Sequence, residues 1–464
     1  MNQILTHIND FLYTYILLFL LAGSGLYFTI RSRGVQLRLL KDGLKSLTEK
    51  KPGKSVSSFQ ALMISTASRV GTGNIAGIAA AITAGGPGAI FWMWVMAVIG
   101  SASAFVESTL AQIYKVKKQD GFIGGPSYYM QQTFHKRWPG VLFSISLILC
   151  FAYGFNGLQA YNISSSLEYY IADYSHTSYP LLVGILLSSA TAFVIWGGIH
   201  RIGFITSVLV PVMATLYILI GLIVSILHIS ELPQLFVSII KDAFDFRAVS
   251  GGLAGSAVII GLKRGLFSNE AGMGSAPNAA ASAVVAHPVN QGLVQVLSVF
   301  IDTILICTST AMLLLLSGVE SKPGILDGIP YVQAAMEANL GTIGIHFMTL
   351  SILTFAFTSI IGNYCYAEPN IRFIKNNKTL LHLFRCTCVA AVFLGTQANF
   401  SLMWNLADIT MGIMAIINIT ALLFLNGISI RALKDYEKQK RLGMNPVFQE
   451  ENIGVKATVW KQDR

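Results

Sequence analysis

Charged residues are scarce in this sequence: Asp, Glu, Lys and Arg make up 12% of its 464 residues. A soluble domain carries about 25% of such residues, so the shortage argues against an ordinary soluble globular protein. Hydrophobic residues account for 53% of the chain and form many runs of about 20 residues, the length that crosses a bilayer as a helix. The sequence therefore predicts an all-α polytopic membrane protein.

Motifs of catalysis and cofactor binding are also missing. The sequence has no H-E-x-x-H, G-x-S-x-G, Walker A or paired C-x-x-C pattern, which argues against an enzyme and a bound cofactor. The five cysteines lie in apolar runs, where free Cys behaves as a small hydrophobic residue. The net charge is +10, but no soluble basic domain is present that would bind nucleic acid.

The apolar runs predict about 11 transmembrane helices. They cover residues 11–30, 57–84, 88–114, 140–170, 180–198, 203–228, 248–264, 289–317, 342–367, 379–396 and 402–427. Most Lys and Arg lie in one set of alternate loops and in the tail, whereas the opposite loops hold only Lys241, Arg247 and Lys322. Cytoplasmic loops accumulate Lys and Arg. We therefore expect a multi-pass protein of the cell (inner or plasma) membrane, with its N-terminus outside and its C-terminus in the cytoplasm.

One span is interrupted by a polar, glycine-rich stretch, residues 65–77 (Ser-Thr-Ala-Ser-Arg-Val-Gly-Thr-Gly-Asn-Ile-Ala-Gly). Irregular backbone at membrane depth is tolerated only where protein buries it or where it lines a cavity. Gly71 and Gly73 permit unwinding. Freed N–H groups at residues 72–74 attract a carboxylate, and freed carbonyls at residues 67–70 suit a small cation. A zwitterion and a sodium ion would satisfy both ends.

Three other interpretations of this stretch remain open. Residues 71–76 match a loose G-x-G-x-x-A dinucleotide fingerprint, but no soluble strand or βαβ unit surrounds them. Gly73 and Gly77 have the spacing of a helix-packing face. A plain helix kink is the third interpretation.

A second break is expected in the other half of the chain if the fold contains an inverted repeat. Residues 250–256 and 267–272 both qualify. Lys263 and Arg264 are expected to mark the cytoplasmic membrane face, which favours residues 250–256 as the unwound centre. Asn269 would then belong to a cytoplasmic helix or gate, together with its neighbour Glu270.

Four stretches resemble the sodium:alanine symporter family, the alanine or glycine:cation symporters. They are residues 70–77 (Val-Gly-Thr-Gly-Asn-Ile-Ala-Gly), 85–94 (Gly-Gly-Pro-Gly-Ala-Ile-Phe-Trp-Met-Trp), 261–277 (Gly-Leu-Lys-Arg-Gly-Leu-Phe-Ser-Asn-Glu-Ala-Gly-Met-Gly-Ser-Ala-Pro) and 287–295 (His-Pro-Val-Asn-Gln-Gly-Leu-Val-Gln). The resemblance covers most of the chain. It implies a leucine-transporter (LeuT) type fold, a 5+5 inverted repeat preceded by one extra N-terminal helix.

The implied organisation has five parts. They are an N-terminal transmembrane helix with a basic cytoplasmic loop (1–56), a first five-helix repeat (57–228), an outer amphipathic connection (229–247), a second five-helix repeat (248–430) and a cytoplasmic tail (431–464).

The resemblance also implies a sodium site. The carbonyls of Ala67 and Val70 would face the hydroxyls of Thr358 and Ser359, because hydroxyl and carbonyl oxygens are the hard ligands that an alkali cation needs. A Thr-Ser pair in a span more often bonds to its own helix, which is the alternative. Arg69 departs from such a break because a cation competes with sodium, so we expect its side chain to point away, toward a carboxylate such as Glu270 or Asp302.

By the same resemblance, the amides of Thr72 and Gly73 hold the substrate carboxylate, and Asn74 faces the substrate or the ion. Further substrate contacts are expected at Gly252 and Gly255 in the second break and at Phe355 in the pocket wall. Gln159 lies with Asn156 and Asn162 within two helical turns, and it either binds the substrate or joins two helices.

The implied function is sodium-coupled symport of a small neutral amino acid, alanine or glycine. Its partners are the amino acid, the sodium ion and the lipid bilayer, with no nucleic acid. A proton-coupled transporter of the same fold is the nearest alternative, and a carboxylate at the ion site would favour it. A channel would need a continuous polar pore, and a sensor would need a soluble signalling domain.

Overall fold

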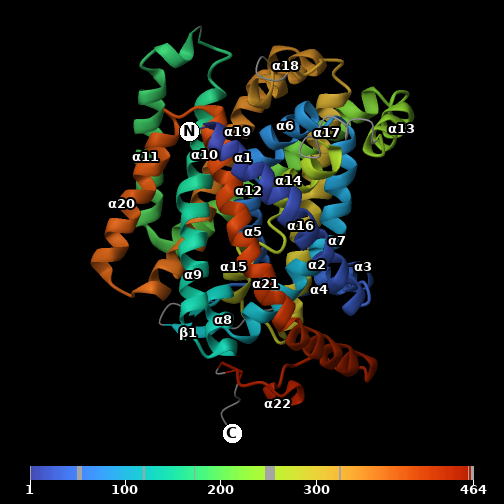
Figure 1. The fold of residues 1–464 in the computed structure, drawn as a ribbon, viewed down its shortest axis with the longest axis vertical. Coiled ribbons are helices and arrows are strands. Elements are labelled where there is room, and N and C mark those ends of the chain that lie inside the picture. Colours follow the sequence, from blue (N-terminus) through green and yellow to red (C-terminus); the bar gives the residue numbers. More distant parts are fainter. Residues whose placement is uncertain are drawn as a thin grey trace.

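The computed structural model describes residues 2–49, 55–118, 121–171, 173–245, 256–322, 326–457 and 459–460. The chain forms a bundle of helices whose N-terminus lies toward the upper end in Figure 1 and whose C-terminus lies at the lower end. The first half contains α1 (Asn2–Phe11), α2 (Leu18–Arg31), α3 (Val35–Arg38), α4 (Leu40–Ser46), α5 (Ser58–Arg69), α6 (Ala76–Gly85), α7 (Gly88–Ile113), α8 (Pro126–Phe134), α9 (Trp138–Leu147), α10 (Asn156–Ser165), α11 (Tyr179–Trp196), α12 (Gly198–Leu227) and α13 (Leu232–Ala243).

The second half contains α14 (Ala257–Asn269), α15 (Ala276–Ser282), α16 (Pro288–Val299), α17 (Thr308–Leu315), α18 (Gly328–Leu340), α19 (Thr342–Ile374), α20 (Lys378–Gly395), α21 (Phe400–Arg441) and α22 (Glu450–Ile453). Wider π-helical turns join three helix pairs, at Leu12–Leu17, Ile148–Phe155 and Phe300–Cys307. A short antiparallel hairpin, β1 (Val116–Lys118) and β2 (Gly121–Ile123), follows α7.

Nine helical stretches in the described residues are long and apolar enough to cross a membrane. They are Gln3–Arg31, Gly88–Ile113, Trp138–Ser165, Tyr179–Trp196, Phe204–Leu227, Pro288–Leu315, Thr342–Ile374, Lys378–Gly395 and Phe400–Arg441. Each overlaps a span that the sequence predicts. The predicted spans 57–84 and 248–264 are not among them, because the first is divided between α5 and α6 and residues 248–255 of the second lie outside the described residues. The structure is that of a multi-pass membrane protein.

The two interrupted helices pack against each other in opposite directions. α5 has 12 residues and leads upward into the first break, while α14 has 13 residues and leads downward into the second (Figure 1). α5 packs against α15, and α6 packs against α14. α5 begins with a capping box, in which the Gln60 amide donates to Ser57 Oγ at 3.1 Å and the Ser57 amide donates to Gln60 Oε1 at 3.0 Å. The packing of α5 against α15 and of α6 against α14 brings the two breaks to the same depth of the bundle.

From the sequence, Lys263 and Arg264 were expected to mark the cytoplasmic membrane face. In the structure, both side chains of α14 are buried inside the protein. Lys263 Nζ lies 2.8 Å and Arg264 Nη2 lies 3.1 Å from Asp408 Oδ2 of α21. Asn9 Nδ2 of α1 donates to the same carboxylate at 3.3 Å, and the Tyr13 hydroxyl donates to the Asp408 carbonyl at 3.1 Å. Two adjacent cations remain inside the protein because a carboxylate distant in sequence compensates them. The same cluster fastens the N-terminal helix to α21.

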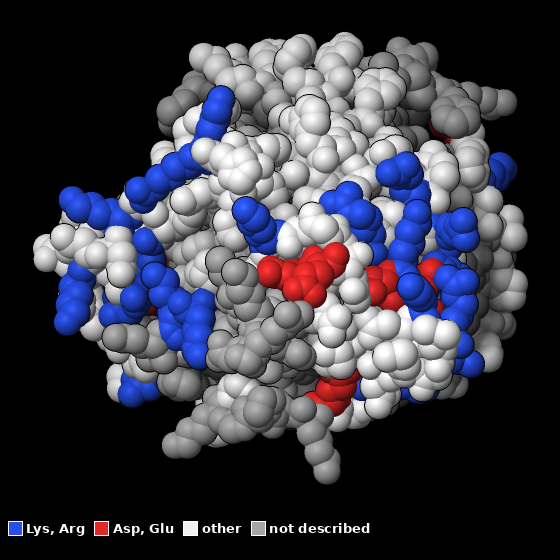
Figure 2. Space-filling model, turned by 90° about the horizontal axis from the view of Figure 1, so that it is seen from below, with Lys and Arg blue, Asp and Glu red and all other residues white. Residues whose placement is uncertain are grey.

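The lower end of the bundle is basic and closed by the chain's last residues. Figure 2 shows Lys and Arg side chains gathered on this end around a smaller group of Asp and Glu. The Val284 amide donates to the Val56 carbonyl at 3.1 Å, which joins the lower ends of α5 and α15. The Trp460 indole donates to the Gln112 carbonyl at 3.0 Å, and its side chain packs against the buried cluster of Ala61, Ala283 and Val285. The tail therefore covers the junction of the two interrupted helices.

Asp408→Asn should strongly destabilise the protein because it leaves Lys263 and Arg264 buried without a counter-charge. The expected loss is about 3–5 kcal/mol, the usual result of removing one partner from a buried ion pair. Thermal unfolding of the purified protein in detergent measures it. Glu231→Gln, which removes an exposed carboxylate at the start of α13, is the control. Equal unfolding midpoints for the two variants would contradict the assignment.

Candidate functional site

The first break contains the carbonyl oxygens that the sequence analysis assigned to a cation. α5 ends at Arg69, Gly71 is extended, and a single turn at Thr72–Asn74 precedes α6. The Ser359 hydroxyl of α19 lies 3.0 Å from the Ala67 carbonyl oxygen and 3.2 Å from the Val70 carbonyl oxygen. The three oxygens converge where α5 ends, and all three residues are buried. Their chemistry is that of an alkali-cation site.

Thr358 is not brought to these oxygens. Its hydroxyl donates to the Thr354 and Phe355 carbonyls of its own helix, both at 3.0 Å. This is the usual bonding of a hydroxyl within a span. Of the Thr-Ser pair, the structure therefore directs only Ser359 toward the break.

The amide end of the break is held by two side chains of α10. The Thr72 amide donates to Gln159 Oε1 at 3.0 Å, and Asn162 Nδ2 donates to the Thr72 hydroxyl at 2.7 Å. At Gly71 a Cβ would lie 2.9 Å from Gln159 Nε2, so the glycine permits this close approach. Gln159 thus contacts the amide that the sequence analysis assigned to a carboxylate, and its amide oxygen occupies the position of an acceptor.

Asn74 links the break to the π-helical turn that follows α16 and to α17, rather than pointing to the three oxygens. Its Nδ2 donates to Asp302 Oδ1 at 2.7 Å, and its Oδ1 accepts from the Gly71 amide at 3.2 Å. The Thr310 hydroxyl donates to the Asn74 carbonyl at 2.6 Å. Asp302 also accepts from Ser268 Oγ at the end of α14. A freed backbone carbonyl and a freed amide are both satisfied in this way.

A second break lies between α14 and α15, next to residues 267–272, whereas most of the preferred segment 250–256 lies outside the described residues. α14 is continuous to Asn269, and the left-handed residues Glu270 (φ 53°), Gly272 (φ 85°) and Gly274 (φ 86°) follow it. Asn269 and Glu270 are both buried, and Glu270 contacts Ser68 of the first interrupted helix. Gly252 and Gly255 lie outside the described residues.

Buried polar side chains fasten the second break to its surroundings. Glu107 of α7 accepts from the amides of Gly272 at 3.3 Å and Gly274 at 3.0 Å, and from Asn418 Nδ2 at 2.8 Å. Glu270 accepts from Ser275 Oγ at 2.6 Å and from Ser68 Oγ of α5 at 3.4 Å. The last contact joins the two breaks directly.

Arg69 lies between these acidic groups without a close ion pair. Its charge interacts with Glu107, Glu270 and Asp302. Among the described residues, however, no carboxylate oxygen lies within ion-pair distance of it, and its Nη1 donates to Gln295 Oε1 of α16 at 3.4 Å. The guanidinium therefore compensates three buried carboxylates at longer range.

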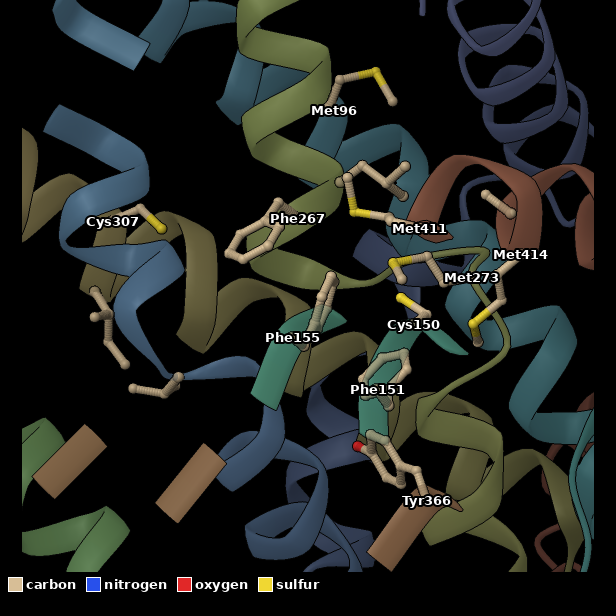
Figure 3. Packing of buried hydrophobic residues seen from close by; sticks show 14 of the residues in the cluster. Met96, Cys150, Phe151, Phe155, Phe267, Met273, Cys307, Tyr366, Met411 and Met414 are labelled. Atoms are coloured by element: carbon tan, nitrogen blue, oxygen red, sulfur yellow. The ribbon is translucent and has the colours of Figure 1, made fainter. Parts of the chain in front are cut away.

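An aromatic cluster that the sequence analysis missed covers the first break. Figure 3 shows the rings of Phe155 and Phe267 next to each other, and their centroids are 4.8 Å apart. Phe267 also lies 5.1 Å from Trp404, and a Cβ on Gly73 would come within 2.5 Å of the Phe267 ring. Phe355, the predicted wall residue, instead packs against Tyr217 at 5.7 Å. Phe267 falls within a quoted family stretch, which was the only available signal.

Comparison with solved structures supports the arrangement of the helices. A mutant of the manganese transporter of Eremococcus coleocola superposes with a TM-score of 0.54 at 14% identity, over 90% of this chain and 85% of that chain. At that identity the likeness concerns the fold alone. Together with the buried, interrupted helices, it defines this chain as a multi-pass membrane protein of a transporter fold.

Sequence comparison identifies the family. Residues 1–450 match the sodium:alanine symporter family, and the chain belongs to it. It is 46% identical to the amino-acid carrier protein AlsT of Bacillus subtilis over 100% of this chain and 98% of that protein. It is 46% identical to the "Probable sodium/glutamine symporter GlnT" of the same organism, over 97% and 94% of the two chains. Identity to the sodium/alanine symporter AgcS of Methanococcus maripaludis is 36%, over 94% and 97%.

Gly73→Ala should perturb the break because its new Cβ would overlap the Phe267 ring. We expect a loss of about 1–3 kcal/mol in stability, as for other overpacked cores. Gly77→Ala is the matched control, since its Cβ would make ordinary contact with Trp404 at 3.5 Å. Thermal unfolding compares the two variants. Phe267→Leu should restore part of the loss in the double variant, and equal midpoints for the two alanine variants would refute the overlap.

Proposed function

We propose that this chain is a secondary active transporter that couples sodium influx to the uptake of a small neutral amino acid, alanine or glycine. The observation that carries the proposal is the convergence of Ser359 Oγ with the carbonyls of Ala67 and Val70, beside the Thr72 amide. A cation and a carboxylate would meet oppositely polarised backbone ends a few residues apart. Membership of the sodium:alanine symporter family supports the same ion and substrate class.

The architecture we propose is the LeuT type, with about 11 transmembrane helices. The two interrupted helices, α5–α6 and α14–α15, would add to the uninterrupted ones, and the antiparallel packing of these two pairs supports an inverted repeat. The N-terminus would lie outside the cell membrane and the C-terminus in the cytoplasm. The basic lower end of the molecule supports that orientation (Figure 2).

In the proposed cycle, sodium orders the first break before the amino acid binds. Sodium bound to the Ala67 and Val70 carbonyls would replace the hydrogen bonds that Ser359 donates to them. The substrate carboxylate would then take the place of Gln159 Oε1 at the Thr72 amide and reach the neighbouring Gly73 amide. Opening toward the lower side requires the Val284–Val56 contact and the tail over it to part. Rocking of one bundle against the other would do this.

The aromatic cluster over Gly73 supports a small substrate side chain. Phe155, Phe267 and Trp404 occupy the space above the break, and they would limit the volume beyond a substrate's α-carbon. One relative is named for glutamine and another for alanine, so the substrate class needs direct measurement.

Uptake into proteoliposomes tests the function. Labelled alanine should accumulate with an inward sodium gradient and not with choline in its place, and unlabelled glycine should compete more strongly than glutamine. Stronger competition by glutamine would reject the small pocket. Absence of sodium-dependent uptake for every small amino acid would reject the proposal.

A proton-coupled transporter is the second candidate because Glu270 and Asp302 are buried beside the two breaks. The same vesicles distinguish the two ions. Uptake driven by an inward proton gradient in sodium-free medium would favour this candidate. Sodium dependence at equal internal and external pH would favour the first.

Ser359→Ala should raise the sodium concentration needed for half-maximal uptake by about tenfold, the effect of losing one ligand worth about 1.4 kcal/mol. Thr358→Ala is the matched control, since its hydroxyl bonds to its own helix. A larger effect at Thr358 than at Ser359 would show that Thr358 turns toward the ion. Equal sodium dependence in Ser359→Ala and the unmodified protein would remove Ser359 from the site.

A further inference from the structure

A basic pocket lies at the lower end of the molecule, far in sequence from both breaks. It has a volume of about 350 Å³ and lies between the turn that follows α2 and the last turns of α21. Figure 2 shows a dense group of Lys and Arg at the right of this face. Most of the pocket's lining residues are basic: Arg31, Arg33, Arg38, Lys434, Lys438 and Arg441. The proposed transport cycle uses none of them.

The pocket has a large excess of positive charge. Its one acidic lining residue, Glu437, pairs with Arg38, whose Nη2 lies 2.6 Å from Glu437 Oε1. In the part of the chain that the structure describes, no carboxylate lies within ion-pair distance of Arg31, Arg33 or Lys434. Lys438 and Arg441 likewise have no such partner there. Closely spaced cations repel one another, so an anion bound among them would be strongly favoured.

Backbone geometry and Arg38 hold this pocket in shape. Arg33 and Gly34 are both left-handed, with φ of 56° and 66°, and they turn the chain sharply from α2 into α3. Arg38 donates to the Ser32 carbonyl at 3.2 Å and the Arg33 carbonyl at 3.3 Å while it pairs with Glu437. The turn is thereby fastened to α21. Arg31, Arg33 and Lys434 are left exposed around the opening.

The location of the pocket favours a membrane lipid over a free anion. Arg31 is the last residue of the candidate span Gln3–Arg31, so the pocket begins where the apolar part of α2 ends. Tyr27 lies one turn earlier, beneath the Arg31 guanidinium at 5.9 Å, and is exposed. Ile30, the neighbour of Arg31 on α2, and Leu423, about two turns before the lining residue Ile430 on α21, are exposed apolar side chains. The cations lie where the apolar, exposed surface of α2 ends. They would match the phosphate of a phospholipid, and the apolar surface would match its acyl chains.

We propose that this pocket binds the headgroup phosphate of an anionic phospholipid, whose acyl chains lie along α2 and α21. Arg31, Arg33 and Lys434 contact the phosphate, and Arg38 holds the turn that positions them. The bound lipid joins the N-terminal helix to α21 at the lower end, as the Asp408 cluster joins them higher in the bundle.

Lipid binding to the purified full-length protein tests the proposal and requires no transport. Native mass spectrometry in neutral detergent counts bound phosphatidylglycerol, with phosphatidylcholine as the uncharged arm and inorganic phosphate as the free-anion arm. We expect phosphatidylglycerol to bind at least about tenfold more tightly than phosphatidylcholine and to raise the thermal midpoint. Equal binding of both lipids, or equal protection by inorganic phosphate, would overturn the lipid assignment.

The triple variant Arg31→Gln, Arg33→Gln, Lys434→Gln should lose about tenfold or more in phosphatidylglycerol affinity. The matched control, Lys136→Gln, Lys375→Gln, Lys378→Gln, removes the same charge from exposed residues away from the pocket and should bind normally. If the triple variant does not fold, Lys434→Gln alone serves, with a loss of about fivefold expected. If the pocket variant and the control variant lose the same affinity for phosphatidylglycerol, the effect comes from net charge alone. That result would contradict the proposed lipid site.

Discussion

Where a helix unwinds inside a membrane, its freed N–H and C=O groups must form hydrogen bonds with the protein or with a ligand. This structure depends on the hydrogen bonds made at two such breaks. Ser359 serves the carbonyls of the first break, and Gln159 serves its amide end. Glu107 serves two amides of the second break. Each partner comes from a different helix, so the breaks hold the bundle together at mid-depth. Any ion or carboxylate that binds there competes with one of these partners.

Buried charged side chains likewise need partners of opposite charge inside the protein. Lys263 and Arg264 both pair with Asp408, while Arg69 lies among Glu107, Glu270 and Asp302 with no close ion pair among the described residues. The first group is tightly paired and joins the N-terminal helix to α21. The second is loosely paired and lies beside the breaks, where a cation would arrive and leave in the proposed cycle. Met273, Met411 and Met414 pack near the second break (Figure 3), and flexible side chains of this kind accommodate small movements.

The sequence predicted the features that depend on local pattern. A polar, glycine-rich run inside an apolar segment indicated the first break, and the fold that the family resemblance implies pointed to Ser359. The burial of Lys263 and Arg264 was not predicted because two adjacent cations resemble a membrane boundary, and their partner Asp408 is 144 residues away from Arg264. The different directions of the Thr358 and Ser359 hydroxyls depend on helix rotation. The choice of Phe267 rather than Phe355 as the cover depends on tertiary packing. Neither the hydroxyl directions nor the position of Phe267 over the break can be predicted from a single sequence.

The central claim is that sodium binds the carbonyl end of the first break and orders it. Hydrogen–deuterium exchange of the purified protein, with sodium and with choline in its place, tests this most directly. The account predicts that sodium slows exchange at residues 67–74 and leaves the peripheral helix α20 unchanged. Exchange at residues 67–74 that does not respond to sodium would contradict it.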